Sequence, residues 1–313
     1  KLKPGETVVF AWITYKSRAQ RDRINAKVMN DPRSKPMQDL KVMPFDKALD
    51  AEPADRLVSG RVIGETDICA YFHTGGTTGL PKVARHTHLN EAFEAWILGE
   101  LEPRPNVVLC GLPLFHVNGA MVTGLGAFHT GSEVVMLTPA GYRGKGVMQN
   151  FWKLVERFRA TTFSAVPTVY GALASLPLDG ADISSLRYAF VGASPLPGEV
   201  ARRFEAVAGI RLHEGYGLTE AACVSSANPM QGERRLGTVG LRLPYQDLRI
   251  WKVDAEGRAR AECAPGEAGV IGICGPNIFP GYLRDDDNRA SGCNPDGSIP
   301  ATSVTSMPTV TCT

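Results

Sequence analysis

Between residues 107 and 213, short apolar runs alternate with segments of helical periodicity, and this alternation constrains the fold more than any other feature. The expected strands are Val107–Cys110, Val134–Leu137, Thr162–Val166, Tyr188–Val191 and Ile210–His213. The expected helices between them are Val147–Phe158, Thr168–Leu176 and Glu199–Ala208. Strand-sized runs that alternate with helices predict an α/β fold, with layered, mainly parallel sheets and flanking helices.

The character of the sequence changes on both sides of this region. Residues 1–66 are polar and show little periodicity, and Asp67 opens a strand-type run, after which Asn90 is expected to cap a helix. After Gly237, two further strands joined by Gly- and Glu-rich sequence predict a barrel-like β annex. We therefore expect an N-terminal remnant over 1–66, a domain core over 67–290 and a disordered tail over 291–313.

Composition excludes several classes of function. The chain has 313 residues, 43% of them hydrophobic, and a net charge of +2 without a basic block, which argues against a nucleic-acid surface. It has no apolar run of about 18 residues and no apolar leader, so neither a membrane span nor secretion is expected. Seven scattered cysteines without a Cys-x-x-Cys pair indicate reduced thiols and a cytoplasmic protein, and no zinc site is expected. The oligomeric state is not readable.

The strongest chemical signal is a loop of glycines and threonines. Its candidate binding residues are Thr74, Gly75, Gly76, Thr77, Thr78, Gly79 and Lys82. Glycines let the backbone approach an anion closely, and successive N–H groups can form an anion-binding concavity to which the hydroxyls and Lys82 add donors. The loop is not a Walker A sequence, because Val83 follows the lysine. It predicts a phosphate site, with a flexible surface turn as the plain alternative.

A second signal lies at residues 214–220, beyond the last strand of the alternating region. Tyr216 offers a flat face on which a base can stack, Thr219 offers a hydroxyl, and Glu220 offers a hard oxygen suited to Mg²⁺. The same segment could form a turn with a helix-capping acid. The candidate binding residues here are Glu214, Gly215, Tyr216 and Gly217.

Two weaker signals stand at turns after expected strands. Gly192, Ala193 and Ser194 lie between a strand and a helix that Pro197 starts, and by composition they are a strand–helix connection. His116 follows Pro113-Leu114-Phe115, and a lone histidine beside apolar residues is as often structural as chemical.

Together these segments resemble the adenylate-forming superfamily, which includes acyl-CoA synthetases, firefly luciferase and the adenylation domains of peptide synthetases. The loop resembles the family's Thr-Ser-Gly-Thr-Thr-Gly-x-Pro-Lys-Gly, with Gly75 in place of Ser and Val83 in place of Gly. Residues 216–220 match the family's Tyr-Gly-x-Thr-Glu, and residues 192–195 resemble its Gly-Ala-Ala-Pro turn. The resemblance covers about 67–290 and implies the large N-terminal domain of these enzymes, incomplete.

The resemblance implies a role for each candidate residue. The loop would hold the β- and γ-phosphates of ATP, Tyr216 would stack on adenine, Thr219 would contact a phosphate, and Glu220 would bind Mg²⁺. The 192–194 turn would line the adenine and acyl pocket. His116 would border the site where the carboxylate enters.

The implied reaction joins a carboxylic acid to AMP and then transfers the acyl group to coenzyme A. Acetyl-CoA synthetases of the superfamily carry Trp where this chain has Gly217, which favours a medium-chain, long-chain or aromatic acid over acetate. The alternatives are an adenylation domain or acyl-AMP ligase that loads a carrier protein, and an inactive nucleotide-binding remnant. Nothing specific favours a luciferase-like oxygenase.

The superfamily requires features that do not follow Gly281-Tyr282: a Thr-Gly-Asp motif, a hinge and a small domain with a catalytic lysine. Codons from Ser298 onward, read in a shifted frame, can encode Thr-Gly-Asp at the expected place. We therefore expect a frameshift between about Ala290 and Ser298 and little normal turnover by this polypeptide. The chain begins without Met, which suggests that N-terminal sequence is missing as well.

Overall fold

The computed structural model describes residues 62–74, 82–254, 259–284 and 310–311. The chain divides into two units, Lys1–Val62 and Ile63–Thr313, and every described helix and strand lies in the second. Residues 1–61 and most of the predicted tail lie outside the described residues, as do five loop candidates, Gly75, Gly76, Thr77, Thr78 and Gly79. Within the described part, no helix combines the length and apolar composition needed to cross a membrane.

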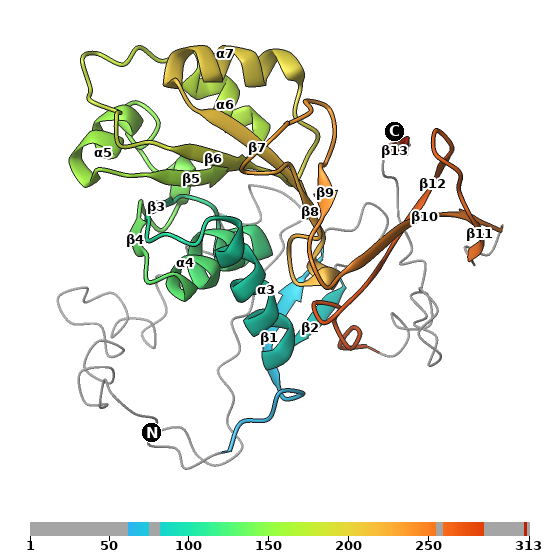
Figure 1. The fold of residues 1–313 in the computed structure, drawn as a ribbon. Helices are drawn as coiled ribbons and strands as arrows, with labels where there is room; N and C mark the ends of the chain where they lie inside the picture. The colour runs from blue at the N-terminus through green and yellow to red at the C-terminus, as the bar shows by residue number, and fades with distance from the viewer. Residues whose placement is uncertain (1–61, 75–81, 255–258, 285–309, 312–313) are drawn as a thin grey trace, which may run out of the picture. The chain divides into compact units, whose positions relative to one another are not determined.

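The second unit is built on a seven-stranded sheet with the strand order β4-β3-β5-β6-β7-β8-β9 (Figure 1). The first five strands in this order are parallel, and β8 and β9 add antiparallel pairs at one edge. Their bounds are β3 Val107–Cys110, β4 Glu133–Met136, β5 Thr162–Ala165, β6 Tyr188–Val191, β7 Arg211–Tyr216, β8 Ser226–Ala227 and β9 Leu241–Arg242. The five predicted strands and the mainly parallel α/β fold are confirmed, with ends shifted by a few residues.

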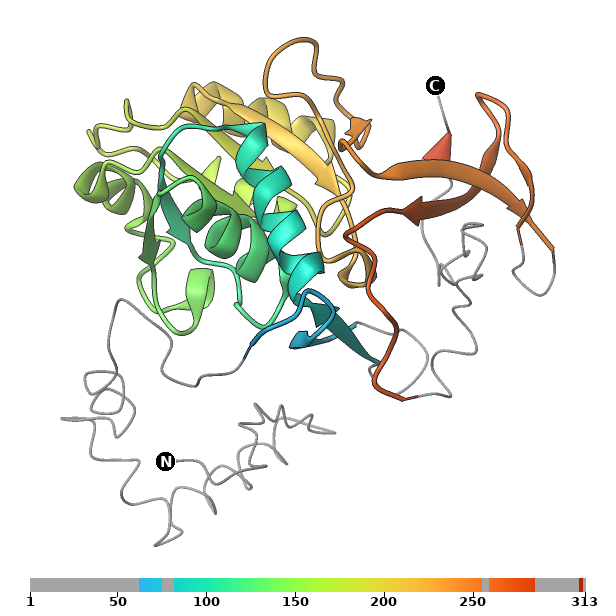
Figure 2. The ribbon, with the colours of Figure 1, turned by 60° about the horizontal axis from the view of Figure 1, so that its bottom comes forward.

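Helices cover both faces of this sheet (Figure 1, Figure 2). One face packs against α5 (Phe151–Phe158), α6 (Pro167–Leu173) and α7 (Gly198–Ala208), and the other against α3 (His88–Leu101), the π-helix η2 (Asn118–Leu125) and α4 (Gly126–His129). Side chains alternate along each strand, so Phe163 faces α5–α7 whereas Thr162 and Ser164 face α3 and η2. The two faces therefore differ in polarity.

The helix ends follow local chemistry. Helix α7 starts after Pro197 and ends at Gly209, whose φ of 67° is the left-handed conformation that glycine adopts readily. Helix α3 starts earlier than expected, because its N-cap is Thr87 and not Asn90. The Thr87 hydroxyl accepts from the Asn90 amide (3.2 Å), and the Asn90 side chain accepts from the Thr87 amide (3.0 Å), which forms a capping box.

Two smaller sheets complete the described structure. The hairpin of β1 (Ile68–His73) and β2 (Val83–Thr87) flanks the glycine–threonine loop. The annex after Gly237 is an antiparallel sheet in the order β11-β10-β12-β13, and its described strands do not close into a barrel. Its strands are β10 Asp247–Val253, β11 Ala259–Glu262, β12 Ala268–Cys274 and β13 Val310–Thr311.

Candidate active site

A cavity of about 360 Å³ opens at the carboxyl ends of β6 and β7. Open α/β sheets bind ligands at this end of their strands. The predicted site residues that line the cavity are Thr74, His116, Gly192, Ala193, Gly215, Tyr216, Gly217, Thr219 and Glu220. The structure therefore brings together segments that are up to about 145 residues apart in sequence, whereas Ser194, Glu214 and Lys82 do not line this cavity.

The residues that flank the glycine–threonine loop lie on the Glu220 side of the cavity. The Thr74 amide donates to the Lys82 carbonyl (2.8 Å), which joins the two ends of the loop. The Lys82 ammonium lies 4.8 Å from the centre of the Tyr282 ring, a cation–π contact. The Tyr282 hydroxyl in turn donates to Glu220 Oε1 (2.7 Å). Lys82 is thus linked through one aromatic ring to the carboxylate proposed for magnesium.

The short helix η4 (Thr219–Ala221) is held by three hydrogen bonds to its backbone. His86 Nε2 donates to the Thr219 carbonyl (2.8 Å), and the Phe279 amide donates to the Glu220 carbonyl (3.0 Å). Asn277 Nδ2 donates to the Ala221 carbonyl (3.0 Å). These bonds fix the backbone of η4, so the Glu220 side chain projects from a rigid support.

His86 and Asn277 are supports that sequence reasoning missed. Both are fully buried, and His86 lies 133 positions from its partner Thr219. No local pattern around His86 marks this contact, because it depends on how the β1–β2 hairpin meets η4.

Two backbone segments approach so closely at Gly217 that no side chain fits there. A Cβ added there would lie 1.5 Å from the carbonyl oxygen of Cys223, which is far below any real contact. At Gly192 the corresponding distance to the Gly215 carbonyl is 3.2 Å, which is tight but not forbidden. Ala193 follows with φ of 66°, an unusual left-handed conformation for a residue with a side chain. The strand ends around the cavity are therefore shaped by backbone geometry.

Glu214 supports the turn after β6 and does not reach the cavity. Its Oε1 accepts from the Leu196 amide (2.9 Å), and its Oε2 has no hydrogen-bond partner. Burial raises the pKa of this carboxyl, and the bond from Leu196 lowers it. Ser194, in the same turn, is exposed. Binding roles for Glu214 and Ser194 stay predictions, and the geometry gives Glu214 a positioning contact.

His116 lies at the cavity in the loop between β3 and η2. The Asn118 amide donates to its Nδ1 (3.2 Å), so that nitrogen carries no proton in this arrangement. His116 is exposed as a whole residue, but protein atoms around its ring keep part of the ring away from water. This partial burial lowers the pKa of His116, and the nearby His73 lowers it further. A neutral His116 at pH 7 can offer an Nε2–H donor to an entering carboxylate.

Tyr216 connects the cavity to the annex. Its ring packs with Leu218 and Leu248 against the cluster of Ile250, Ile271 and Ile273. Burial raises the pKa of its hydroxyl, and the Glu220 carboxylate raises it further, so the phenol stays neutral. A half-buried aromatic ring that also lines the cavity is suited to stacking on a base.

The apolar side of the cavity was not predicted from the sequence. It is formed by Leu98, Leu101, Val117, Val122, Phe190, Val191, Leu218, Cys223, Val224 and Ala227. These residues come from α3, η2, β6 and β8 and from the loops beside η2 and η4, and each lies in a segment that reads as ordinary core.

A magnesium ion carried by a nucleotide fits this site better than a resident metal. Among the described residues, no group of three or more His, Cys, Asp or Glu side chains could hold an ion. Of the described residues that line the cavity, Glu220 is the one that carries a carboxylate. Mg²⁺ is commonly held by one or two carboxylates together with substrate phosphates, so a single carboxylate suits that arrangement.

Known proteins match this chain over most of its length. The family model for AMP-binding enzymes matches residues 6–283. A marinolic acid–CoA ligase from Pseudoalteromonas sp. (strain SANK 73390) is 42% identical over 254 residues, which are 79% of this chain and 39% of the relative. A long-chain-fatty-acid–CoA ligase from Bacillus subtilis (strain 168) is 32% identical over 253 residues, 79% of this chain and 43% of the relative.

Solved structures agree with the sequence relatives. ATP-bound MatB from Rhodopseudomonas palustris superposes with a TM-score of 0.65 at 30% identity, over 76% of this chain and 45% of that chain. The chain spans less than half the length of each of these three proteins. With a family model that covers residues 6–283 and a cavity built from the family's motifs, the chain belongs to the AMP-binding enzyme family.

Proposed function

We propose that this chain contributes the adenylate-forming site of an acyl-CoA synthetase, which activates a carboxylic acid with ATP and transfers it to coenzyme A. The observation that carries the proposal is the convergence of Thr74, Tyr216, Thr219 and Glu220 on one cavity. CoA ligases among the relatives support the same reaction class. Free thiols at the described cysteines support a reducing compartment, and we propose the cytoplasm.

The proposed chemistry brings together two anions, a carboxylate and a polyphosphate. Tyr216 would stack on the adenine, while Thr219 and the loop that starts at Thr74 would bind phosphate oxygens. Glu220 would hold magnesium, which supplies positive charge next to the phosphates when bound. His116 would orient the carboxylate for attack on the α-phosphorus. Positioning and electrostatic stabilisation account for most catalysis in such transfers.

The apolar walls support an acid larger than acetate. Leu98, Val122 and Phe190 are among the apolar side chains that line the cavity of about 360 Å³. We therefore propose a medium-chain, long-chain or aromatic acid. Two alternatives compete with an acyl-CoA synthetase: an enzyme that transfers the acyl group to a carrier protein, and an inactive remnant that binds the nucleotide without turnover.

Calorimetric titration of the chain with ATP, with and without Mg²⁺, tests the nucleotide site. We expect Glu220→Gln to abolish most of the gain in affinity that Mg²⁺ gives, and Tyr216→Ala to weaken binding by about tenfold through lost stacking. Glu262→Gln, an exposed annex residue outside the cavity, is the matched control. Equal ATP affinity in all four proteins would contradict the site.

Turnover is tested separately by pyrophosphate release with a panel of acids, followed by AMP release on addition of coenzyme A or a carrier protein. Release that depends on coenzyme A supports the synthetase, release that depends on the carrier protein supports the loading alternative, and nucleotide binding without release supports the inactive remnant.

A further inference from the structure

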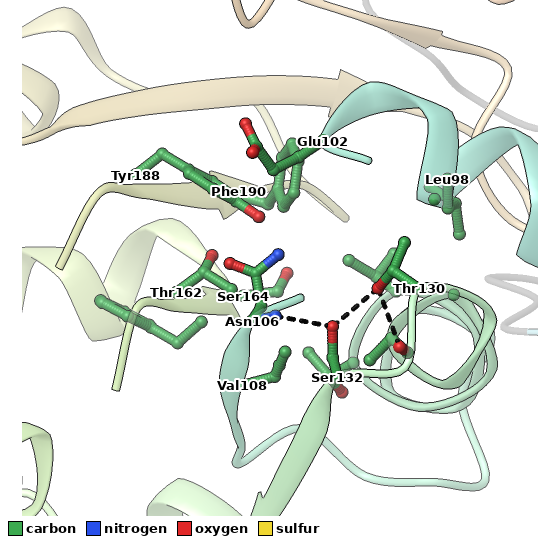
Figure 3. Close-up of a pocket in the computed structure, with 16 residues that line it drawn as sticks. Leu98, Glu102, Asn106, Val108, Thr130, Ser132, Thr162, Ser164, Tyr188 and Phe190 are labelled. Atoms are coloured by element: carbon green, nitrogen blue, oxygen red, sulfur yellow. Dashed lines mark hydrogen bonds between the residues drawn. The ribbon is translucent and has the colours of Figure 1, made fainter. Parts of the chain in front are cut away.

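Next to the candidate active site lies a second chamber of about 40 Å³, between the sheet and the helices α3, η2 and α4 (Figure 3). Four side chains line both spaces and so separate them: Leu98, Val122, Ser164 and Phe190. For an acyl chain held on the apolar side of the larger cavity, these four side chains are the wall between the chain and the chamber.

The chamber has buried polar side chains on its sheet side among apolar neighbours such as Val108 and Val122. Figure 3 shows the polar ends of Asn106, Thr162, Ser164 and Tyr188 gathered on the sheet side. Each of these four residues is less than 9% exposed. Buried faces of strands normally carry apolar side chains, so this concentration of polar groups calls for partners.

Most of the chamber's polar groups already have partners in the protein. Ser132 Oγ accepts from the Asn106 amide (2.9 Å) and is bonded to Thr130 Oγ1 (2.7 Å), as the dashed lines in Figure 3 show. The hydroxyl of Thr123 donates to the Gly119 carbonyl (2.8 Å). The polar groups on this side of the chamber therefore have hydrogen-bond partners within the protein and need none from a ligand.

Thr162 differs from these residues. Its buried hydroxyl has no partner that meets both the distance and the angle of a hydrogen bond among the described residues, although it lies close enough to the Tyr188 hydroxyl to lower the pKa of that phenol. Burial, and then the charge of Glu102, raise the pKa of Tyr188 to about 12, while Thr162, Arg187 and Asn106 act to lower it. Tyr188 is thus a neutral phenol beside an unpaired hydroxyl. Leaving such a buried group without a partner destabilises the folded state.

We propose that this chamber receives the far end of the acid, and that this end carries a hydroxyl or carbonyl oxygen. The inference rests on the proposed function and narrows its substrate class to acids oxygenated at the end remote from the carboxylate. A methyl terminus would displace water and leave Thr162 unpaired, whereas an oxygen would pair with it. Sites built to hydrogen-bond a substrate group discriminate strongly against analogues that lack it. Phe190 stands in the wall and would turn aside to admit the chain.

The test is calorimetric titration of the chain, with AMP present, by pairs of unbranched acids with equal numbers of non-hydrogen atoms. One member of each pair ends in a methyl group and the other in a hydroxyl, over six to twelve carbons. We expect the hydroxyl-ended acid to bind about tenfold more tightly at the length that reaches the chamber. Water also fits in a chamber of this size, and it is the competing occupant.

Two variants separate recognition from folding. Thr162→Val should abolish the preference for hydroxyl-ended acids and leave the melting temperature unchanged or higher, because the free protein loses no hydrogen bond. Thr123→Val removes a hydroxyl in the same chamber that already has a partner, so the preference should persist while the melting temperature falls. A loss of preference in both variants, or in neither, would overturn the role of Thr162.

The remaining outcomes distinguish the two proposals. If AMP binds but methyl-ended acids bind as tightly as hydroxyl-ended ones at every length, the chamber holds only water, and this inference alone is wrong. If AMP does not bind, the proposed function fails and the inference falls with it. Phe190→Ala should raise the affinity for longer acids, and an unchanged length profile would contradict the path through the wall.

Discussion

The parallel sheet and the antiparallel annex are stabilised by different kinds of contact. Behind the parallel strands, Phe151, Phe163, Tyr170 and Phe204 are almost completely buried and meet mostly edge to face. The annex carries ion pairs on exposed strands, and its buried part is a small cluster around Ile250, Ile271 and Ile273. The cavity lies where the strand ends of the first meet the loop that packs on the second.

The two regions therefore contribute differently: the parallel sheet stabilises the fold, and the annex positions the backbone of η4. The aromatic cluster fixes the ends of β6 and β7, which carry Gly192 and Tyr216. The annex contributes less buried apolar surface, but Asn277 beyond β12 binds the backbone of η4, next to Glu220. We therefore expect damage to the core to unfold the domain, and damage to the annex side to loosen η4, the segment that carries Glu220, first.

The largest expected effect is in the core. Phe204→Ala should lower the free energy of unfolding by about 3–5 kcal/mol, because it leaves a cavity beside Phe163 and Tyr170. Ile273→Val in the annex should cost only about 0.5–1.5 kcal/mol. Urea unfolding followed by circular dichroism measures both. Equal losses would remove the distinction between the two regions.

A second prediction concerns Glu94, which joins α3 to the loop after η4. Its Oε1 accepts a hydrogen bond from the Val224 amide (2.6 Å). Burial raises the pKa of Glu94 to about 8, although the bond from Val224 acts to lower it. The folded state therefore keeps a proton that the unfolded chain loses from about pH 4.5 upward. Stability should fall as pH rises from about 4.5 to 8, by at most about 1.4 kcal/mol per pH unit, and level off above.

Glu94→Gln should remove that slope, because a neutral amide of the same shape has no proton to lose. Urea unfolding of both proteins at several pH values from 5 to 9 gives the difference directly. Parallel curves for the two proteins would show that Glu94 is ionised in the folded state.

An intermediate effect is expected at Asn277, which bonds to Ala221 and to the Gln246 side chain (3.1 Å). Asn277→Ala should cost about 1–3 kcal/mol, since it leaves buried acceptors unpaired. It should also weaken ATP binding in the presence of Mg²⁺ more than in its absence. Asn150→Ala, which removes an exposed side-chain bond to Gly146, is the control. A uniform loss of ATP affinity would argue against the positioning role.

The smallest effect is expected on the exposed strands of the annex. Arg249 pairs with Asp247 (2.9 Å) and Glu262 (3.3 Å), all at the surface. Exposed ion pairs contribute little because solvent screens them. Arg249→Ala should leave the urea midpoint unchanged at both low and high salt, and a clear shift would mean that the annex depends on charge more than on its isoleucines.

Sequence reasoning recovered the features that local pattern encodes. Periodicity located the strands, Pro197 marked the start of α7, and the residue types at 216–220 pointed to a nucleotide. It failed where partners are distant in sequence, as with His86 and Thr219. Thr162 was read as part of a core strand, because strand periodicity does not reveal what a side chain faces across the helix layer.

The contact between Gly217 and the Cys223 carbonyl limits how this lineage can diversify. With a Cβ only 1.5 Å from that oxygen, no single substitution at 217 is tolerated unless the 217–223 segment is rerouted. Under the proposed function, a change in the size of the acid would therefore come from other positions on the cavity wall, such as Leu98 or Val224.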